Sequence, residues 1–331
     1  MNTPLRIGIL GTGNIAKRAL LAPAIDMPEV IVTAVASRDV ARAQAYAAEN
    51  GVLRACDYVG LLADSEVDVV YITLPPTMHA EWSIQALEAG KHVLCEKPMS
   101  ANEREARAVM AAVERTGRVY MEAFHFPYHP FAKRVRDLLD TRALGGITGA
   151  EAHFQIPRKY IAAGNIRRNY SLGGGALMDV GCYALNALRR LLGEPEAVLE
   201  AKAQVDSSDL QTDVAMSATL IFPSGRQGRL LASFLADEQP DVELVVQGER
   251  GRVEVSSLYV PQWGGALNME WGQHRYVERA DPTPSYVFQL RELVRCIRDG
   301  APVLTSAEDG AMNMRAIDAI YRKAGLRLRG E

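Results

Sequence analysis

Near its N-terminus the chain reads Gly8-Ile9-Leu10-Gly11-Thr12-Gly13-Asn14-Ile15-Ala16, a Gly-x-Gly-x-x-Ala motif between a strand-like run and a helix-like stretch. In this context Gly11 permits a tight turn, Gly13 lets a pyrophosphate approach the backbone, and Ala16 lets the helix pack closely on the strand. The helix N-terminus then directs its unpaired N–H groups at the phosphates. A glycine turn without a ligand is the alternative. The strand–turn–helix context favours a dinucleotide site formed by Gly11, Thr12, Gly13, Asn14 and Ile15.

The glycine motif is followed by an alternation of strand-like and helix-like segments through residue 122. The runs that predict strands are Ile7–Leu10, Ile31–Ala36, Val67–Thr73, His92–Cys95 and Val119–Glu122. Because helix-like stretches separate the first four, we expect right-handed βαβ units and a parallel sheet. Ser100 with Glu103 is typical of a capping box that starts a helix over residues 102–116. Residues 1–123 are therefore predicted to form a dinucleotide-binding Rossmann domain with a doubly wound parallel sheet.

The pattern changes after about Phe124. Helices are predicted at Pro130–Asp140, Gly175–Leu192, Ser285–Asp299 and Ala307–Lys323, the last one starting with a capping box of Thr305 and Glu308. The predicted strands lack intervening helices for most of their length, which indicates a mostly antiparallel sheet. They are Ile147–Ile156, Ala197–Val205, Val214–Phe222, Gly228–Phe234, Val242–Gln247 and Arg252–Val255. Residues 124–331 are predicted to form an α+β substrate-binding and oligomerisation domain with a large open sheet, whose last helix can pack back on the Rossmann domain.

Length and composition favour a soluble globular α/β protein of two domains. The chain has 331 residues, of which 48% are hydrophobic and 23% charged, and this excludes disordered, collagen-like and coiled-coil classes. A net charge of −3 argues against nucleic-acid and membrane partners. The four scattered cysteines lack a Cys-x-x-Cys pair, which argues against a disulfide framework or zinc site and favours a reducing compartment. Without a signal-like N-terminus or a membrane-length apolar run, we expect a cytoplasmic protein without a metal.

The residues that choose between NAD and NADP usually follow the glycine motif by about 20 residues, at the end of the second strand. Enzymes that use NAD commonly carry Asp or Glu there, whereas this chain has Ala36-Ser37-Arg38-Asp39. Ser37 can donate a hydrogen bond to a 2′-phosphate, and Arg38 can pair with it while lying over the adenine. In the alternative, Arg38 is a solvated surface cation and Asp39 is the N-cap of the next helix. The Ser37-Arg38 pair favours NADP(H).

Two more segments follow predicted strands, at the edge of an open α/β sheet where ligands bind. One extends from Ile72 to His79, and the other ends in Glu96-Lys97-Pro98. His79 begins a helix, so a capping or packing role competes with a catalytic one. Lysine is rarely buried unless paired, so Lys97 at a strand end could stabilise an alkoxide or lower the pKa of a neighbouring acid. We expect the cofactor to contact Thr73, Leu74, Pro75, His79, Glu96 and Lys97.

The glycine-rich segment at residues 172–183 opens a predicted helix that carries Asp179 and Tyr183. These two residues are four apart, so they share one helix face. A carboxylate beside a phenol at a pocket suits proton transfer. A helix N-terminal acid and a core-edge tyrosine explain the pattern equally well. The residues just upstream are either substrate contacts or parts of a solvated loop: Asn165, Arg167, Arg168 and Tyr170.

Three segments together resemble the glucose-fructose oxidoreductase / inositol dehydrogenase (Gfo/Idh/MocA) family over nearly the whole chain. They are residues 11–16, the run Ala89-Gly90-Lys91-His92-Val93-Leu94-Cys95-Glu96-Lys97-Pro98, and the run Gly173-Gly174-Gly175-Ala176-Leu177-Met178-Asp179-Val180-Gly181-Cys182-Tyr183. Within the family, Met121-Glu122-Ala123-Phe124 and Asp179-Val180-Gly181-Cys182-Tyr183 look most like dimeric dihydrodiol dehydrogenases, NADP-dependent xylose dehydrogenases and related sugar oxidoreductases.

The resemblance implies that Lys97 is the catalytic lysine, that Tyr183 takes the proton-donor position held by His in many relatives, and that Asp179 assists. It also implies that the C-terminal sheet covers the nicotinamide and mediates a homodimer or higher homo-oligomer. Pro127 stands where this subgroup commonly has an arginine, so a fixed guanidinium is missing and the substrate does not follow from the family. The expected substrate-binding residues are Phe124, His125, Asn165, Arg167, Asp179 and Tyr183.

Three hypotheses of function follow. The first is an NADP(H)-dependent dehydrogenase or reductase that transfers hydride between the nicotinamide and a carbinol or carbonyl carbon of a sugar, sugar derivative or vicinal diol. The second is an NAD-dependent glycoside-cleaving enzyme of the same fold, against which Ser37-Arg38 argues. The third is a non-catalytic NADP-sensing regulatory protein, which the intact Lys97, Asp179 and Tyr183 disfavour. The expected partner is a small carbohydrate or diol.

Overall fold

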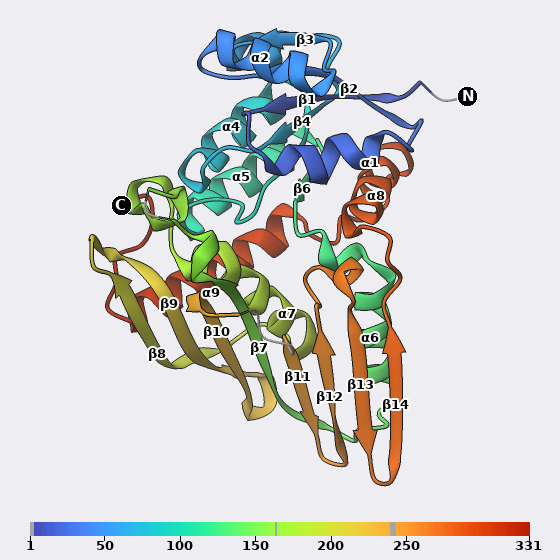
Figure 1. The fold of residues 1–331 in the computed structure, drawn as a ribbon, viewed down its shortest axis with the longest axis vertical. Helices are drawn as coiled ribbons and strands as arrows, with labels where there is room; N and C mark the ends of the chain where they lie inside the picture. Colours follow the sequence, from blue (N-terminus) through green and yellow to red (C-terminus); the bar gives the residue numbers. More distant parts are fainter. Residues whose placement is uncertain (1–2, 163, 239–242) are drawn as a thin grey trace. The chain divides into compact units, whose positions relative to one another are not determined.

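The computed structural model describes residues 3–162, 164–238 and 243–331, shown as a ribbon in Figure 1. The chain forms two compact units. The first comprises Met1–His125 and Tyr286–Ala311, and the second comprises Phe126–Ser285 and Met312–Glu331. The division of roles between residues 1–123 and 124–331 stays a prediction. Among the described residues, no helix has both the length and the apolar composition that crossing a membrane requires.

A six-stranded sheet forms the centre of the first unit, in the order β3-β2-β1-β4-β5-β6. All neighbouring strands are parallel, and this is the strand order of a doubly wound dinucleotide-binding fold, which confirms the predicted Rossmann sheet. Every residue of β4 is buried, as expected for a central parallel strand. The strands are β1 (Leu5–Leu10), β2 (Val30–Ala36), β3 (Arg54–Cys56), β4 (Val69–Ile72), β5 (His92–Cys95) and β6 (Tyr120–Glu122).

Five helices between residues 22 and 116 connect these strands, and a sixth, α8, comes from much later in the chain. The helix after the glycine turn begins with a π-helical turn, Lys17–Leu21, before α1. The helices are α1 (Ala22–Ala24), α2 (Val40–Asn50), α3 (Tyr58–Ala63), α4 (Pro76–Glu88), α5 (Glu103–Thr116) and α8 (Ser285–Asp299). Helix α9 (Ala307–Lys323) begins in the first unit and continues in the second.

The start of α5 corrects the predicted capping box. Asn102, not Ser100, is the N-cap, and its side chain accepts a hydrogen bond from the backbone N–H of Glu105 over 3.1 Å. Glu105 in turn accepts from the N–H of Ala101 over 3.0 Å. The Ser100 hydroxyl donates to the Asn102 carbonyl instead. The box is thus displaced by two residues, because Asn is as strong a cap as Ser.

The start of α9 corrects the second predicted capping box in the same way. The Ser306 hydroxyl, rather than that of Thr305, accepts from the backbone N–H of Asp309 over 3.3 Å. The Thr305 hydroxyl donates over 2.6 Å to the carbonyl of Glu122, at the end of β6. The Thr305 hydroxyl, which the sequence pattern assigned to the start of the helix, therefore binds a carbonyl of β6.

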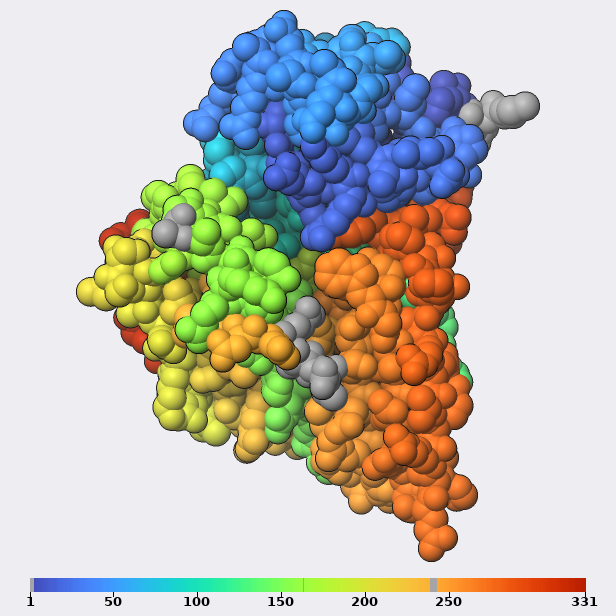
Figure 2. All heavy atoms as spheres, in the orientation of Figure 1, coloured from blue at the N-terminus to red at the C-terminus, as the bar shows by residue number. Residues whose placement is uncertain are grey.

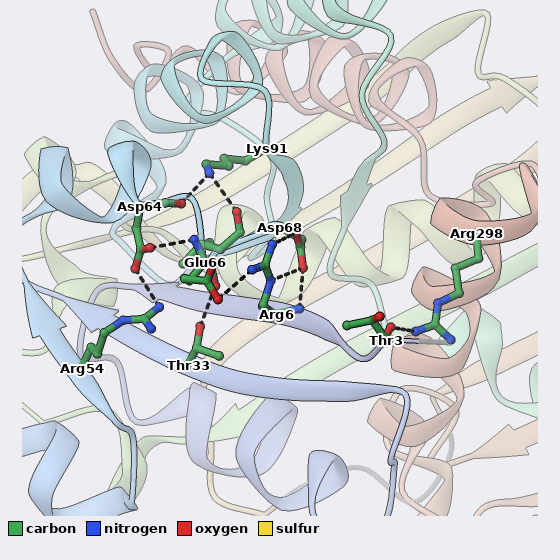
Figure 3. A network of polar contacts seen from close by, with 10 residues as sticks. Thr3, Arg6, Thr33, Arg54, Asp64, Glu66, Asp68, Lys91 and Arg298 are labelled. Carbon is green, nitrogen blue, oxygen red and sulfur yellow. Dashed lines mark hydrogen bonds and ion pairs between the residues drawn. The ribbon is translucent and has the colours of Figure 1, made fainter. Parts of the chain in front are cut away.

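A polar network joins the amino ends of the strands in this unit (Figure 3). Arg6, at the start of β1, donates to both oxygens of Asp68 over 2.7 and 2.9 Å and pairs with Glu66. Arg6 thereby lowers the pKa of Asp68. Lys91, just before β5, donates to two backbone carbonyls, one of them that of Asp64. The charges gather at the amino edge of the sheet, opposite the carboxyl edge where ligands of such sheets bind.

The second unit contains an eight-stranded sheet in the order β14-β13-β12-β11-β7-β10-β9-β8. Only the β7–β10 pairing is parallel, so the predicted mostly antiparallel sheet is confirmed. The hairpin of β13 and β14 is the orange region whose turn projects in Figures 1 and 2. The strands are β7 (Ile147–Pro157), β8 (Ala197–Asp206), β9 (Asp209–Phe222), β10 (Arg226–Ala236), β11 (Leu244–Gly248), β12 (Gly251–Ser256), β13 (Ala266–Trp271) and β14 (His274–Arg279).

Helix α7 (Cys182–Leu192) packs on β7 and β10, and α6 (Pro130–Asp140) has the predicted bounds. The predicted helix from Gly175 starts later, because Gly175 has a φ of +137° that no helix accommodates. A π-helical turn, Leu177–Gly181, precedes α7. Short 3₁₀ turns lie at Phe126–Tyr128, Arg158–Tyr160, Ile166–Arg168, Tyr170–Leu172, Pro223–Gly225 and Pro261–Trp263.

Candidate functional site

The glycine turn after β1 has the geometry that a dinucleotide site requires. Gly11 has a φ of +108°, and a Cβ on it would lie 2.8 Å from the Thr73 hydroxyl oxygen. A Cβ on Gly13 would lie 3.1 Å from the Thr73 carbonyl oxygen. The N–H of Thr73, directly after β4, donates to the carbonyl of Leu10. The turn therefore lies close against the end of β4, which favours glycine at both positions, as in the tight turn that this type of dinucleotide site requires.

The end of β2 presents a serine and an exposed arginine. Ser37 is 7% exposed, and its N–H donates to the carbonyl of Cys56 in β3. Arg38 is exposed. Asp39 is the N-cap of α2 and accepts from the N–H of Ala41 over 3.0 Å. This is the capping role that the alternative interpretation of the sequence gave to Asp39. An exposed cation beside a serine fits a 2′-phosphate better than a ribose hydroxyl.

His79 links the loops that follow β4 and β5. It is 1% exposed, and Nδ1 lies 2.7 Å from the Pro98 carbonyl oxygen while Nε2 lies 2.7 Å from the Leu74 carbonyl oxygen. Burial lowers the pKa of His79 and so disfavours the protonated ring. Only the protonated ring could donate to both carbonyls at once. The contacts are those of the packing alternative. Through them, His79 holds Leu74 and Pro98, which adjoin the predicted cofactor contacts Pro75 and Lys97 in the sequence.

Glu96 and Lys97 follow β5 in a polar cluster of the first unit. The Tyr71 hydroxyl donates to the Glu96 carboxylate over 2.5 Å. Burial raises the pKa of Glu96, and the charges of Lys97 and Arg18 act against that rise. The Arg18 guanidinium lies 5.9 Å from the centre of the Tyr286 ring, whose hydroxyl pKa is raised by burial. Lys97 is half-buried, and its charge is one of those that act on Glu96.

Three members of this cluster were missed in the sequence: Arg18, Tyr71 and Tyr286. Arg18 lies in the π-helical turn after the glycine motif, and Tyr71 precedes the loop at Thr73 by two residues. Tyr286 lies far away in the sequence, at the start of α8. Only the position of Arg18, in the helix that begins at the phosphate turn, offered a signal. The predicted substrate residues Phe124 and His125 are buried in the same unit, with the His125 ring 4.1 Å from that of Tyr286.

The second unit brings two predicted substrate residues together. The Arg167 guanidinium donates to the Asp179 carboxylate, with Nε and Oδ2 2.6 Å apart. Asn165 caps the 3₁₀ turn that carries Arg167, accepting from its N–H over 3.0 Å. Asp179 itself lies in the π-helical turn Leu177–Gly181, a rare conformation that is frequent at functional sites.

Tyr183 lies at the start of α7, with only 7% of its surface exposed. Three aromatic rings of the same unit surround it, with ring centres 5.3 Å away for Phe154, 5.6 Å for Tyr259 and 6.0 Å for Phe126. These rings fix the orientation of the phenol ring. The π-helical turn and this cluster together set the positions of Asp179 and Tyr183 within the unit.

The other two loop residues considered from the sequence have structural partners. Arg168 pairs with the buried Asp206, and this ion pair holds the pKa of Asp206 well below its usual range. The Tyr170 hydroxyl donates to the carbonyl of Leu328 near the C-terminus. Their side chains therefore hold the loop to β8 and to the C-terminal residues.

Comparison with known proteins gives matches over both units. The model of the oxidoreductase family with an NAD-binding Rossmann fold matches residues 5–124, and the GFO/IDH/MocA C-terminal domain matches residues 132–254. The chain is 36% identical, over 97% of both chains, to D-xylose 1-dehydrogenase (NADP(+)) 2 of Haloferax volcanii. It is 35% identical to a dTDP-3,4-didehydro-2,6-dideoxy-alpha-D-glucose 3-reductase of Saccharopolyspora spinosa, over 82% of this chain and 80% of that protein.

A solved structure is similar over the same extent. The 3-ketoreductase from Actinomadura kijaniata, in complex with NADP and TDP-benzene, matches with a TM-score of 0.87 at 29% identity, covering 97% of this chain and 98% of that one. The predicted resemblance is thus confirmed by family models for both units and by relatives that match from end to end. The chain belongs to the GFO/IDH/MocA family of oxidoreductases.

Proposed function

We propose that this protein is an NADP(H)-dependent oxidoreductase that transfers hydride between the nicotinamide and a carbinol or carbonyl carbon of a sugar, sugar derivative or vicinal diol. The observation that carries the proposal is the pairing of two features at one edge of the parallel sheet. The turn at Gly11 and Gly13 packs so closely on Thr73 that a Cβ on either glycine would crowd it, and β2 is followed by Ser37-Arg38. A 36% identical relative whose name specifies NADP(+) supports it.

The residues of the first unit fit NADP(H). When bound, the cofactor would supply or accept the hydride. The N–H groups of residues 12–15 would hold its pyrophosphate, whereas the N–H of Gly11 already donates to the carbonyl of Ala36. Ser37 with Arg38 would hold the 2′-phosphate. The loops braced by His79 would contact it through Thr73, Leu74 and Pro75, and Glu96 and Lys97 would line its far end.

The catalytic roles are proposals that rest on side-chain chemistry. Tyr183 would pass a proton to or from the substrate oxygen. Lys97 would stabilise the negative charge that develops on that oxygen. Asp179, oriented by its ion pair with Arg167, would align a substrate hydroxyl. Phe124, His125 and Asn165 remain predicted substrate contacts.

A homodimer or higher oligomer is part of the proposal. The sheet face opposite α7 carries a shallow depression lined by charged and polar side chains, among them Glu151, Lys202 and Arg229. Ion pairs on this face, such as Glu151 with Arg229, supply alternating charges that a second copy could complement. We propose that this face pairs with its own copy. A monomer in sedimentation velocity at micromolar concentration would contradict this. For the compartment we propose the cytoplasm, to which the free cysteines among the described residues are suited.

The test is steady-state turnover of the purified protein with NADPH, NADP⁺, NADH and NAD⁺. The panel holds free aldoses including D-xylose, dTDP-linked ketosugars, a trans-dihydrodiol and aryl glycosides. The proposal predicts NADP(H)-dependent turnover of at least one sugar or diol. Glycoside cleavage that needs only catalytic NAD⁺ would establish the second hypothesis instead. Tight NADPH binding without turnover of any compound would establish the third.

A further inference from the structure

Arg329, near the C-terminus, forms a fully buried ion pair in the second unit. Its Nη2 lies 2.7 Å from Oδ1 of Asp213, and both side chains are 0% exposed. Burial raises the pKa of Asp213, and the charge of Arg329 acts against that rise. Removing two charges from water costs about as much as their attraction returns, so such a pair is weak evidence for stability. Its position in the fold offers another explanation.

The polar contacts of this pair converge on the segment that leads into the π-helical turn. Arg329 Nε donates to the Gly174 carbonyl over 2.6 Å, and the other oxygen of Asp213 accepts from the N–H of Leu177 over 2.7 Å. The hydroxyl of Tyr321, in α9, donates to Asp213 over 2.8 Å. The network thus binds the backbone on both sides of Gly175.

Gly175 shows how closely this segment is held. A Cβ at this position would lie 2.3 Å from Oδ1 of Asp213 and 2.8 Å from both the Tyr321 hydroxyl and Nη2 of Arg329. With a φ of +137°, the residue has a conformation that L side chains rarely adopt. Gly175 and these three side chains therefore fix the backbone conformation that leads into the first turn of the helix.

The same network reaches the partner of Asp179. The N–H of Gly175 donates to the carbonyl of Arg167 over 2.9 Å. The Arg329 guanidinium lies 5.0 Å from the ring centre of Tyr170, which is three residues after Arg167. Both members of the Arg167–Asp179 ion pair are thus attached to one buried network.

We propose that Asp213, Tyr321 and Arg329 form a lock that positions the Asp179 carboxylate and the Tyr183 phenol for reaction. The three are positioning residues, since their contacts run to the backbone before the helix. The inference rests on the proposed function, because it takes Asp179 and Tyr183 as the groups that act on the substrate. A misplacement of about 1 Å in a reacting group can cost on the order of 100-fold in rate, so release of the lock should lower kcat.

The test compares Arg329→Met and Tyr321→Phe with a matched control, Arg189→Met. Arg189 is also a buried arginine of this unit, with 2% of its side chain exposed, and it donates to Glu194 over 2.7 and 2.9 Å towards the end of α7. Its removal breaks an ion pair whose acidic partner, Glu194, is 49% exposed, and it leaves the segment at Gly175 untouched. The readouts are kcat, the KM of the sugar, thermal stability, and amide hydrogen exchange of peptides covering residues 174–183.

We expect both lock variants to lower kcat by about tenfold or more at temperatures where they are folded, with the NADPH dissociation constant unchanged. Tyr321→Phe keeps the shape of the side chain, so it separates the lock from gross misfolding. Arg329→Lys, which keeps the charge, should recover part of the loss. Arg189→Met should lower the melting temperature and leave kcat unchanged. Exchange at residues 174–179 should rise in Arg329→Met and not in Arg189→Met, because the hydrogen bond of Arg189 to Asn313 reaches this stretch of chain only at the carbonyl of Cys182.

Equal losses of melting temperature in Arg329→Met and Arg189→Met, with kcat unchanged in both, would reduce the lock to a contribution to stability and overturn the proposal. Unchanged exchange at residues 174–179 in Arg329→Met would overturn it as well. The exchange measurement needs no substrate. If the wild-type protein turns over no sugar or diol, the proposed function fails, while exchange alone still decides whether Asp213, Tyr321 and Arg329 hold the turn.

Discussion

The Arg167 guanidinium and the Asp179 carboxylate form an ion pair in which Nε and Oδ2 are 2.6 Å apart. The Asp179 side chain is 15% exposed and that of Arg167 39% exposed, so the carboxylate is the better shielded partner. The arginine occupies one side of the carboxylate and restricts the directions from which a substrate hydroxyl can bind. A residue that sequence reasoning treated as a direct substrate contact also orients another predicted site residue.

Arg167→Met should therefore lower kcat/KM for the sugar by about tenfold, with most of the change in KM, because an orienting charge for Asp179 is lost in ground state and transition state alike. Steady-state kinetics at saturating NADPH measure it. Lys159→Met is the matched control, since Lys159 is an exposed cation in the same loop that lies over the Tyr160 ring. Equal kinetics for Arg167→Met and Lys159→Met would contradict the role given to Arg167.

Cofactor preference tests the end of β2. NADPH should bind at least about tenfold more tightly than NADH, which corresponds to about 1.4 kcal/mol. Arg38→Ala should weaken NADPH far more than NADH, because only NADPH carries the 2′-phosphate. Titration of both nucleotides by fluorescence measures the two dissociation constants. Arg54→Ala, which removes a half-exposed cation paired with Asp64, serves as control and should change neither. Equal affinity for both nucleotides in the wild type would show that Ser37 and Arg38 do not bind a 2′-phosphate.

His79 offers a third prediction, at the brace between two loops. His79→Phe removes both contacts to the Leu74 and Pro98 carbonyls, so it should lower the melting temperature and weaken NADPH binding by about tenfold. His79→Gln retains a donor and should be milder. Ser83→Ala, another buried polar change in α4, should leave NADPH affinity as in the wild type. An unchanged NADPH affinity in His79→Phe would show that the brace serves stability alone.

The sequence was sufficient for the parallel sheet and for most of the antiparallel one, because periodic apolar runs mark buried strands. It missed β3, a half-exposed edge strand of three residues, and the hairpin β13–β14. Leu267 and Met269 of β13 alternate with polar residues, but the mostly polar edge strand β14 has no buried residue to mark it. The predicted strand Val242–Gln247 begins at Leu244 among the described residues, and Val242 lies outside them. Both capping boxes shifted because neighbouring Asn and Ser residues compete as caps.

The candidate site was only partly visible in the sequence. The glycine turn, the Ser37-Arg38 pair and the Lys97 loop follow from local spacing, because each comes directly after a strand. The contacts of Tyr286 with Arg18, and of Arg329 with Asp213, join residues more than 100 positions apart. No periodicity encodes such pairings, since they depend on how elements pack.

Acid should selectively weaken the attachment of the loop at Arg168. The folded-state pKa of Asp206 lies below its unfolded value, so the folded protein binds fewer protons at this group than the unfolded chain does. Its stabilisation is therefore fully present above the unfolded pKa of about 3.9 and is lost as pH falls towards the folded pKa. The melting temperature of Asp206→Asn should fall below that of the wild type at pH 7, and the difference should shrink below pH 4.

Differential scanning calorimetry across this pH range makes the comparison. Asp137→Asn changes an exposed carboxylate paired with Lys133 on α6, and its melting temperature should follow the wild type at every pH. A constant gap between Asp206→Asn and the wild type from pH 7 to pH 3 would contradict the shifted pKa of Asp206.

We propose that Lys97 and Tyr183 carry out charge stabilisation and proton transfer during an NADP(H)-dependent hydride transfer. The measurement that tests it most directly is kcat of Lys97→Met and Tyr183→Phe at saturating NADPH and the best sugar or diol of the panel. Lys97→Met should lose more than ~100-fold in kcat with NADPH affinity within a few fold of the wild type. Tyr183→Phe should lose about 10² to 10⁴. If Tyr183→Phe keeps near-normal turnover while Lys97→Met is inactive, the lysine is the acid/base. Near-normal turnover in both variants would contradict the proposed roles of Lys97 and Tyr183.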